Sequence, residues 1–381
     1  MTDTVSTLAS LVAFPSICGT ANGPIINWIE QYLERLGARI VRVPGEQEGR
    51  FSLFASLGPM VADGIVLSAH CDVVPVEGQN WSFDPFTLTE QDGKLYGRGS
   101  SDMKGFLACM LTAATYAANK PLERPLHLAI SHDEELGCLG VRSLLATLRT
   151  NGLQARGCVV GEPTSMQVAT AHKGKVALQI ICHGQAAHSA NPFQGINAIV
   201  MASKMVLAAQ ELQQHIASTE KHDARFGLAF STVQTGLING GTALNIVPDQ
   251  CCITTEIRLL PGVSVQPYLK WLENAALRIT QNNTRGNIEI IETNAYPGLN
   301  SDGQSKDFLH SVMRYAKQND ITVIDFGTEA GLFEQELGIP CYVCGPGSIS
   351  RAHKADEYIT RPELDDGDRF LNTIVESLCA L

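Results

Sequence analysis

Several apolar runs in this chain end in an acidic or imidazole side chain, and this pattern constrains the fold more than any other feature. These side chains are His70 with Asp72, Asp102, Glu134 with Glu135, and Glu162. Each lies where a buried strand ends or where a loop begins. Because open α/β sheets bind ligands at the carboxyl ends of their strands, all of these groups can converge on one edge. The pattern therefore predicts an α/β sheet that assembles a metal site.

The order of the expected elements indicates two domains. The chain has 381 residues, which exceeds the usual size of a single core. Strands and helices alternate up to about residue 172, as in a sheet that is covered on both faces. We expect a three-layer α/β domain with a mixed central sheet, built from residues 1–172 and 293–381. An α+β domain of residues 173–292 is expected as an insertion.

Composition and charge argue against two classes of partner. Lys and Arg number 28 against 39 Asp and Glu, and the resulting net charge of -11 repels a phosphate backbone. Neither a secretory signal peptide nor a run of membrane-spanning length is recognisable. The eleven cysteines are scattered through apolar runs, so reduced thiols are expected. We expect a soluble cytoplasmic protein without a nucleic-acid or membrane partner.

His70 and Asp72 are the first pair of candidate site residues. A lone histidine at a strand end is more often structural than a metal ligand, but Asp72 follows at i+2. On an extended strand both side chains leave the same face, so Asp72 can accept a hydrogen bond from the imidazole. This contact fixes the tautomer of a metal-binding histidine. Asp72 is thus predicted to orient His70 and not to bind the metal.

The carboxylates near Asp102 and Glu134 have two interpretations each. Asp102 lies in a glycine-rich loop before an apolar helix, where it either caps the helix or bridges two cations. Asp133, Glu134 and Glu135 are either exposed acids at a helix start or buried acids that a cation must neutralise. In a metal site, one glutamate can be a ligand and the other a general base.

Glu162 and His353 complete the set of possible ligands. Glu162 precedes Pro163, which stiffens the turn, although a surface turn is the alternative. His353 is unremarkable alone, and only the number of ligands brings it into the set. Two histidines and three carboxylates are what a pair of zinc ions with one bridging acid requires.

These motifs also occur in the order of one known family. The sequence resembles the zinc aminoacylase, carboxypeptidase and desuccinylase family of co-catalytic metallohydrolases through nearly its whole length. The motifs that carry the resemblance are His70-x-Asp72-Val73-Val74-Pro75, Gly97-Arg98-Gly99 to Asp102-Met103-Lys104-Gly105, Asp133-Glu134-Glu135, Gly161-Glu162-Pro163 and His353.

The resemblance implies a role for each of these residues. His70 and Glu162 would hold one Zn²⁺, Glu135 and His353 would hold the other, and Asp102 would bridge the two. Co²⁺ can substitute for Zn²⁺. The resemblance further implies a cis peptide bond after Asp102. Glu134 would be the general base for hydroxide attack on an acyl carbon, and would return the proton to the leaving amine.

The inserted domain has an implied role as well. In the family it is a ferredoxin-like lid through which a homodimer forms. A lid histidine of the partner subunit there stabilises the tetrahedral oxyanion, and His188 in Gly184-Gln185-Ala186-Ala187-His188-Ser189-Ala190 matches that motif. A solvated turn residue is the alternative for His188.

The segment 327–331 indicates the substrate. Gly327-Thr328-Glu329-Ala330-Gly331 is similar to the segment of family members that release L-ornithine and acetate from N-acetyl-L-ornithine, a step of arginine biosynthesis. The desuccinylases of the diaminopimelate pathway tend to have Thr-Ser-Asp-Gly instead. Thr328 and Glu329 are therefore candidate substrate contacts, and Glu329 would receive a cationic amine.

Other contacts and substrates stay open. Arg258 matches a family arginine that grips an α-carboxylate, and Asn245 and Lys173 are weaker candidates for the same pocket. N-acetylcitrulline, N-formyl amino acids, N-succinyl-diaminopimelate and peptides are alternative substrates, because one pocket residue can redirect specificity. A noncatalytic metal-binding protein is the alternative of another class.

Overall fold

The computed structural model describes residues 3–281 and 285–380, which divide into two compact units. The described residues of Met1–Ala171, Leu299–Val323 and Thr328–Leu381 form unit 1, and those of His172–Gly298 and Ile324–Gly327 form unit 2. The second break falls after Gly298 and not after residue 292. The reason is that strand β12 (Asn287–Tyr296) continues beyond the expected end of the inserted domain.

Unit 1 is built on a mixed sheet. Its strands follow the order β1 (Arg39–Pro44), β2 (Phe51–Leu57), β6 (Leu126–Ser131), β3 (Gly64–His70), β7 (Ala155–Val160), β15 (Cys341–Val343), β8 (Val168–His172) and β13 (Leu299–Asn300), while β14 (Ile321–Ile324) pairs with β8. β3 runs parallel to β6 and β7, whereas β1 and β2 pair antiparallel. β3 and β6 are buried at every position, as expected for strands covered on both faces.

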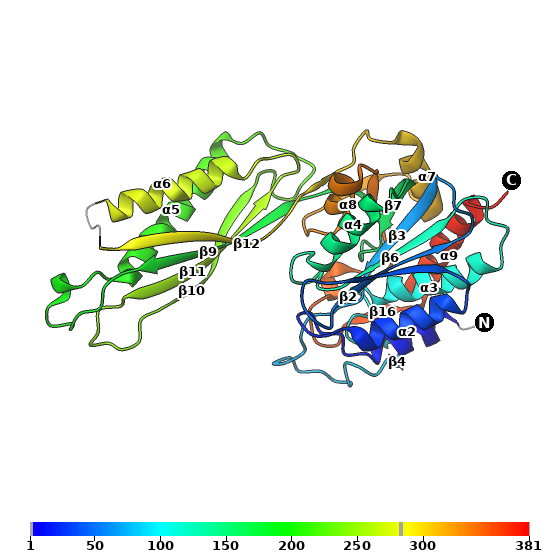
Figure 1. The fold of residues 1–381 in the computed structure, drawn as a ribbon, viewed down its shortest axis with the longest axis horizontal. Coiled ribbons are helices and arrows are strands. Elements are labelled where there is room, and N and C mark those ends of the chain that lie inside the picture. The colour runs from blue at the N-terminus through cyan, green and yellow to red at the C-terminus, as the bar shows by residue number, and fades with distance from the viewer. Residues whose placement is uncertain (1–2, 282–284, 381) are drawn as a thin grey trace. The chain divides into compact units, whose positions relative to one another are not determined.

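Helices cover both faces of this sheet (Figure 1). On one side lie α2 (Gly23–Glu34), α3 (Lys104–Ala118) and α9 (Arg361–Ser377), and on the other lie α4 (Gly140–Thr150) and α8 (Ala330–Leu337). The remaining elements of unit 1 are α1 (Thr4–Val12), α7 (Lys306–Ala316), the 3-10 turn η2 (Ile349–Arg351) and a small sheet of β16 (Tyr358–Thr360), β5 (Lys94–Tyr96) and β4 (Thr89–Gln91). The layers confirm the expected three-layer α/β architecture with a mixed central sheet.

Unit 2 has the expected ferredoxin-like topology. Its elements are β9 (Gly174–His183), the 3-10 turn η1 (Pro192–Gln194), α5 (Ala198–Thr219), β10 (Thr232–Gly240), β11 (Gln250–Leu259), α6 (Gln266–Thr280) and β12. The strands form an antiparallel sheet in the order β10, β11, β9, β12. Burial alternates along β9 and β11, because one face of the sheet packs against the helices in a separate core.

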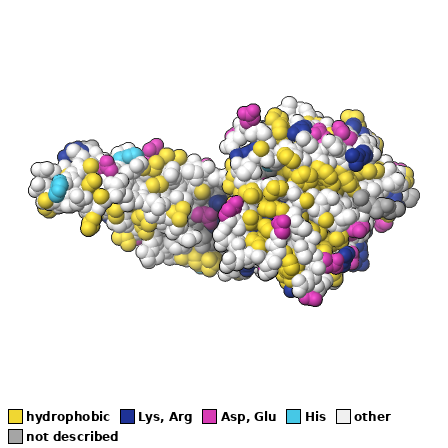
Figure 2. Space-filling model, turned by 90° about the horizontal axis from the view of Figure 1, so that it is seen from below, with side chains coloured by type: hydrophobic (Ala, Val, Ile, Leu, Met, Phe, Trp, Pro, Cys, Tyr) yellow, Lys and Arg dark blue, Asp and Glu magenta, His cyan; other side chains and the backbone are white. Residues whose placement is uncertain are grey.

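The charges on the surface and the length of the helices concern nucleic-acid and membrane partners, respectively. On the face seen in Figure 2, Lys and Arg side chains lie scattered among acidic and uncharged ones. Of the helices in the described residues, none has the length and apolar character that a membrane crossing requires.

Candidate metal centre

Adjacent parallel strands bring the candidate ligands to one edge of the sheet in unit 1. His70 is the last residue of β3, while Glu134 and Glu135 follow β6 and Glu162 follows β7. β3 lies between β6 and β7 in the sheet and is parallel to both. The carboxyl ends of the three strands therefore meet, as the sequence pattern predicted.

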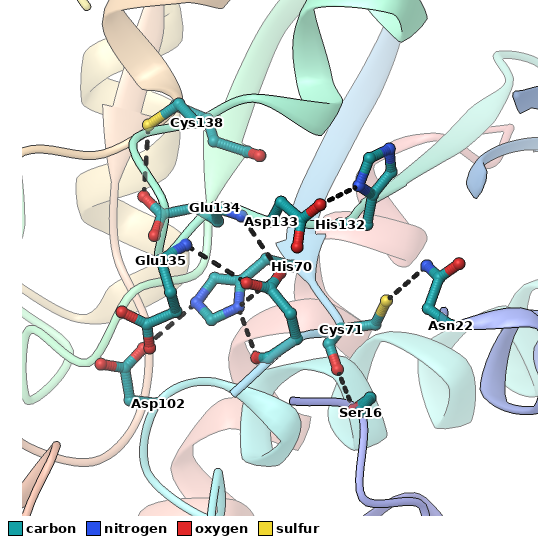
Figure 3. Close-up of polar contacts among 12 residues, drawn as sticks. Ser16, Asn22, His70, Cys71, Asp102, His132, Asp133, Glu134, Glu135 and Cys138 are labelled. Carbon is teal, nitrogen blue, oxygen red and sulfur yellow. Dashed lines mark hydrogen bonds and ion pairs between the residues drawn. The ribbon is translucent and has the colours of Figure 1, made fainter. Parts of the chain in front are cut away.

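The side chains form two groups that share Asp102. One group is His70, Asp102 and Glu162, and the other is Asp102, Glu135 and His353, with the ligand atoms of each group within 4.8 Å of one another. His70 Nε2 lies 3.2 Å from Asp102 Oδ1 and 3.9 Å from Glu162 Oε1. His353 Nε2 lies 3.3 Å from Asp102 Oδ2 and 3.0 Å from the Glu135 carboxylate. Asp102 thus presents a different oxygen to each histidine, and Figure 3 shows it beside His70 and Glu135.

This set of donors fits a pair of divalent cations. Imidazole nitrogens and carboxylate oxygens are ordinary zinc ligands. Glu162 Oε1 is buried and has no hydrogen-bond partner among the described residues, which is costly unless a cation neutralises it. His70 directs Nε2 to the carboxylates while Nδ1 lies 2.9 Å from the backbone oxygen of Asp72, the usual arrangement for a metal histidine.

The electrostatics of the two groups are also those of a cation site. Burial and then the charge of Asp102 raise the pKa of Glu135, and raise the pKa of Glu162 well above its usual value. Burial alone would raise the pKa of Asp102, but hydrogen bonds from His353 and His70 lower it. Hydrogen bonds to Asp102 and Glu135 raise the pKa of His353 to about 10. Without a cation His353 therefore holds a proton at neutral pH, which a bound metal would displace.

Asp72 does not orient His70 through its carboxylate, and that expectation was wrong. His70 Nδ1 is 3.6 Å from Asp72 Oδ1 but 2.9 Å from the backbone oxygen, so the backbone fixes the tautomer. The carboxylate instead accepts the backbone N–H of Glu134 at 3.1 Å and that of Glu135 at 3.2 Å. The side chain of Asp72 does not follow the alternation of the strand, because β3 ends at His70 and Asp72 lies outside it.

Glu134 lies beside the cluster and belongs to neither group of ligands. Burial raises the pKa of its carboxyl group well above the usual value, and the charges of Glu135 and Glu329 add to this. Cys138, which the sequence analysis overlooked, donates a hydrogen bond from Sγ to Glu134 Oε1 at 3.3 Å (Figure 3). A carboxylate whose burial favours its protonated form, and which is not itself a ligand, suits a general base.

Asp102 lies in the loop between β5 and α3. The peptide bond between Asp102 and Met103 is cis, as the resemblance implied. Lys104 begins α3 and donates from Nζ to the backbone oxygen of Phe14 at 2.8 Å. Burial lowers the pKa of Lys104 to about 8. Lys104, which directly follows Met103 of the cis peptide bond, is therefore buried and held by this hydrogen bond.

Glu357 is a second buried residue that holds the loop of Asp102, and it was not predicted from the sequence. This carboxylate is 1% exposed and accepts a hydrogen bond from Arg98 at 2.7 Å. It also accepts the backbone N–H of Gly99 at 3.0 Å, of Ser101 at 2.9 Å and of Asp102 at 3.0 Å. The glycine-rich motif around Arg98 was visible in the sequence, but nothing local identified an acid more than 250 residues away as its partner.

Thr328 and Glu329 are both buried in unit 1. Thr328 Oγ1 accepts the backbone N–H of Ala330 at 3.0 Å, and Glu329 Oε2 accepts the hydroxyl of Ser68 at 3.2 Å. Burial raises the pKa of Glu329 to about 7. The structure thus places Glu329 next to β3, close enough to Glu134 to raise its pKa, while contact with a substrate amine stays a prediction.

His188 and Asn245 come together in unit 2. Both residues are exposed, and they lie on neighbouring segments because His188 forms an isolated β-bridge with Ile246. The backbone oxygen of Asn245 accepts the N–H of Ser189 at 3.0 Å. His188 Nδ1 accepts the N–H of Ala190 at 3.1 Å. A neutral imidazole that accepts at Nδ1 carries its proton on Nε2, so His188 presents a donor.

Arg258 and Lys173 both have partners within unit 2. Arg258 Nε lies 2.6 Å from Glu256 Oε1, and Arg258 Nη1 lies 3.0 Å from the hydroxyl of Tyr296. Lys173 is 3% exposed, and its ammonium group donates to two backbone oxygens of the segment 228–230 at 2.8 and 3.0 Å. These two hydrogen bonds from Lys173 hold the segment 228–230 in place.

Comparisons with known proteins agree with this arrangement. The sequence profile of peptidase family M20/M25/M40 matches residues 66–377. The chain is 33% identical to an acetylornithine deacetylase of Proteus mirabilis over 377 residues, which cover 97% of this chain and 95% of that protein.

Solved structures share the fold at lower identity. A metallo-carboxypeptidase of the M20 family from Sulfolobus solfataricus has a TM-score of 0.81 at 19% identity, with 99% of each chain covered. Human carnosine dipeptidase 1 has a TM-score of 0.76 at 18% identity, covering 98% of this chain and 95% of that one. A dinuclear metal-binding peptidase of the M20 family from Bacillus subtilis has a TM-score of 0.70 at 16% identity, covering 98% and 97%.

Proposed function

Because the chain belongs to peptidase family M20/M25/M40, we propose that it is a metal-dependent amidohydrolase that converts N-acetyl-L-ornithine into L-ornithine and acetate. The observation that carries the chemistry is the cluster of five ligands around Asp102 with Glu134 beside it. The substrate rests on the acetylornithine deacetylase that is 33% identical and on the segment 327–331. The reaction would belong to arginine biosynthesis.

Two Zn²⁺ ions per subunit, or Co²⁺ in their place, are the proposed cofactors. His70 and Glu162 would hold one ion, Glu135 and His353 the other, and Asp102 would bridge them. When bound, such ions polarise a carbonyl group and acidify water. The buried Oε1 of Glu162, which has no hydrogen-bond partner among the described residues, supports this assignment, because a cation would satisfy it.

Glu134 is the proposed general base. Its buried carboxylate beside both groups would take a proton and return it to the leaving amine, and the burial that raises its pKa favours the protonated form. Asp72 holds the backbone of Glu134 and Cys138 holds one carboxylate oxygen, so both ends of the residue are positioned. Such positioning would favour the geometry that proton transfer needs.

Unit 2 is proposed to be the lid and dimerisation domain of a homodimer. The Nε2–H of His188 in the partner subunit would then stabilise the tetrahedral oxyanion. Large apolar side chains are exposed on β10 and α5, and such surfaces often mark interfaces. They are Leu207, Leu237 and Ile238.

Arg258 and Asn245 are proposed to receive the α-carboxylate of the substrate, and Glu329 the side-chain amine. A guanidinium can bind a carboxylate through two parallel hydrogen bonds. Arg258 is at present paired with Glu256, so substrate binding would have to compete with that contact. Glu329 is buried beside the hydroxyl groups of Ser68 and Ser131, so a substrate amine would have to join these contacts.

The state of the cysteines supports a cytoplasmic location. All eleven cysteines lie in the described residues and are free thiols. Cys158 and Cys341 are register neighbours on β7 and β15 and still are not linked. Unlinked thiol pairs of this kind are typical of a reducing compartment.

A peptidase is the second candidate. The metallo-carboxypeptidase and the carnosine dipeptidase share the fold, and the same cluster could attack a peptide bond. N-acetylcitrulline, N-succinyl-diaminopimelate and N-formyl amino acids are further possible substrates. A noncatalytic metal-binding protein is disfavoured, because Glu134 and all five ligands are present.

The proposal is tested by product release from zinc-loaded protein. N-acetyl-L-ornithine is compared with N-acetylcitrulline, N-succinyl-diaminopimelate and a dipeptide, with chelator-treated protein as the control. Glu134→Gln should lower kcat about 10²- to 10⁴-fold, whereas Glu46→Gln, in an exposed loop, should not. Preference for another substrate would overturn the specificity, and the absence of any metal-dependent turnover would overturn the reaction.

A further inference from the structure

A chain of hydrogen bonds connects the backbones of two proposed ligands, Asp102 and His353. Gln79 Nε2 donates to the backbone oxygen of His353 at 3.0 Å, and Gln79 Oε1 accepts from Arg98 Nη2. Arg98 Nη1 donates to Glu357 at 2.7 Å. The other oxygen of Glu357 accepts the backbone N–H of Asp102 at 3.0 Å. We call Gln79, Arg98 and Glu357 the connecting triad.

The buried part of the triad makes many hydrogen bonds, although Arg98 Nε has no partner among the described residues. Arg98 and Glu357 are each 1% exposed, and a buried ion pair is costly unless its remaining groups find partners. Glu357 meets this condition through three backbone N–H groups of the loop 99–102. Arg98 also donates to the backbone oxygen of Lys354 at 3.2 Å and lies 4.9 Å from the ring centre of Trp81. These contacts leave the side chains of Arg98 and Glu357 few other conformations.

His353 needs such support more than the other ligands do. Its side chain is 51% exposed, whereas that of Asp102 is 6% exposed, so packing does not hold the imidazole. The backbone of His353 has φ of 62°, in the left-handed region that costs energy for a residue other than glycine. The hydrogen bond from Gln79 ends on the carbonyl group of this residue. The triad therefore fixes the backbone from which the exposed imidazole reaches Asp102 and Glu135.

The two metal groups depend on the triad to different degrees. Asp102 belongs to both groups, but His353 belongs only to the group with Glu135. The contact of Gln79 lies at the His353 end, so its loss should affect that group alone. His70 and Glu162 are supplied by the ends of the strands β3 and β7 and do not use Gln79.

We infer that Gln79 is a positioning residue that sets the Zn²⁺ affinity of the group Asp102, Glu135 and His353, and that Arg98 and Glu357 position the Asp102 that both groups share. The inference rests on the proposed function, because it takes Zn²⁺ as the ligand of both groups. Partners of metal ligands typically change metal affinity 10- to 100-fold when they are replaced. The predicted effect of losing the Gln79 contact is thus selective weakening of one of the two zinc ions.

Gln79→Ala is the principal test. Gln79 is half-buried, and the variant removes its contacts with His353, Arg98 and Trp81 while both charged groups of the buried ion pair of Arg98 and Glu357 are kept. Ser82→Ala is the matched control. Ser82 Oγ donates to Asp356 at 2.8 Å, so it joins the same two segments of the chain without contacting the backbone of a ligand.

The measurement is a calorimetric Zn²⁺ titration of metal-free protein. For Gln79→Ala we expect one zinc ion to bind as in the wild type and the other to bind about 10-fold or more weakly. Ser82→Ala should match the wild type at both steps. In a His353→Ala background, adding Gln79→Ala should cause no further loss, because the residue that it positions is gone.

Three results would overturn the inference alone. These are a wild-type titration for Gln79→Ala, equal weakening of both zinc ions together with a lower Tm of the metal-free protein, and a further loss in the His353→Ala background. Glu357→Gln tests the Asp102 end, and with an unchanged far-ultraviolet circular dichroism we expect it to weaken both zinc ions, because both groups share Asp102. A wild-type protein that binds no zinc would overturn the proposed function as well, so the two failures are distinguishable.

Discussion

The carboxylate of Asp72 accepts the backbone N–H of Glu134, with 3.1 Å between Asp72 Oδ1 and Glu134 N. Its other oxygen accepts the N–H of Glu135 at 3.2 Å. One buried carboxylate therefore holds the backbone of the proposed general base and of a proposed ligand. A change at Asp72 should act through these two residues and not through the tautomer of His70, which the backbone of Asp72 fixes.

Asp72→Asn should lower kcat by about 10- to 100-fold. The amide keeps the shape of the carboxylate but turns a donor toward one of the two N–H groups, and an unpaired buried N–H costs about 1–3 kcal/mol. Steady-state kinetics with N-acetyl-L-ornithine and the zinc content of the variant measure the effect. Asp63→Asn, at an exposed carboxylate, is the control. An unchanged kcat for Asp72→Asn would show that these hydrogen bonds do not position Glu134.

Cys138→Ala should lower kcat about 3- to 10-fold and leave KM unchanged, because a hydrogen bond to Glu134 is worth about 1 kcal/mol. Cys138→Ser should restore most of the rate, since a hydroxyl group can also donate to Glu134 Oε1. Both variants have the same φ of 57° to satisfy, so backbone strain is matched between them. Equal rates for the alanine and serine variants would remove Cys138 from the positioning of the base.

The sequence predicted those features that depend on neighbouring residues. His70 and Glu162 lie at one edge of the sheet, as expected from their positions at the ends of apolar runs that become parallel neighbours. Helix α9 was not predicted, although Thr360 and Glu363 form a capping box that can be read from the sequence.

Other features of the site depend on tertiary packing. The contact between Glu357 and the loop of Asp102 joins segments that are 255 residues apart, and no local pattern encodes it. The interpretation of Asp72 failed for a related reason. The exact end of β3 decides whether the side chain follows strand alternation, and strand ends are the least predictable part of an element.

Zinc binding should release protons at pH 7. Hydrogen bonds to Asp102 and Glu135 raise the pKa of His353 to about 10, so in metal-free protein this imidazole is protonated at neutral pH. A zinc ligand must be neutral, and the proton has to leave. Titrations in buffers of different ionisation enthalpy should show release of about one proton or more per two zinc ions, with affinity falling as the pH falls. Heats that do not depend on the buffer would contradict this linkage.

The stability of unit 1 should fall between about pH 6.5 and pH 4 because of His127. Burial, and then the charge of Arg39, lowers the pKa of His127 from 6.5 to about 4. Its Nδ1 lies 2.8 Å from Ser56 Oγ and its ring stacks on Phe54. Below pH 6.5 the unfolded chain gains a proton on this residue, while the folded chain stays neutral until about pH 4.

This difference in protonation favours unfolding by at most about 3 kcal/mol at the acid end. The contribution of His127 is therefore fully present above its unfolded pKa and is lost as the pH falls toward the folded pKa. Denaturant unfolding of His127→Asn should show a shallower loss of stability from pH 6.5 to pH 4 than the wild type does. Between pH 7 and pH 8.5 His127 is neutral in both the folded and the unfolded wild-type chain. In this range the stability of the wild type and of His127→Asn should therefore change with pH to the same extent. Identical slopes in the acid range would mean that His127 is not the buried neutral group that its packing indicates.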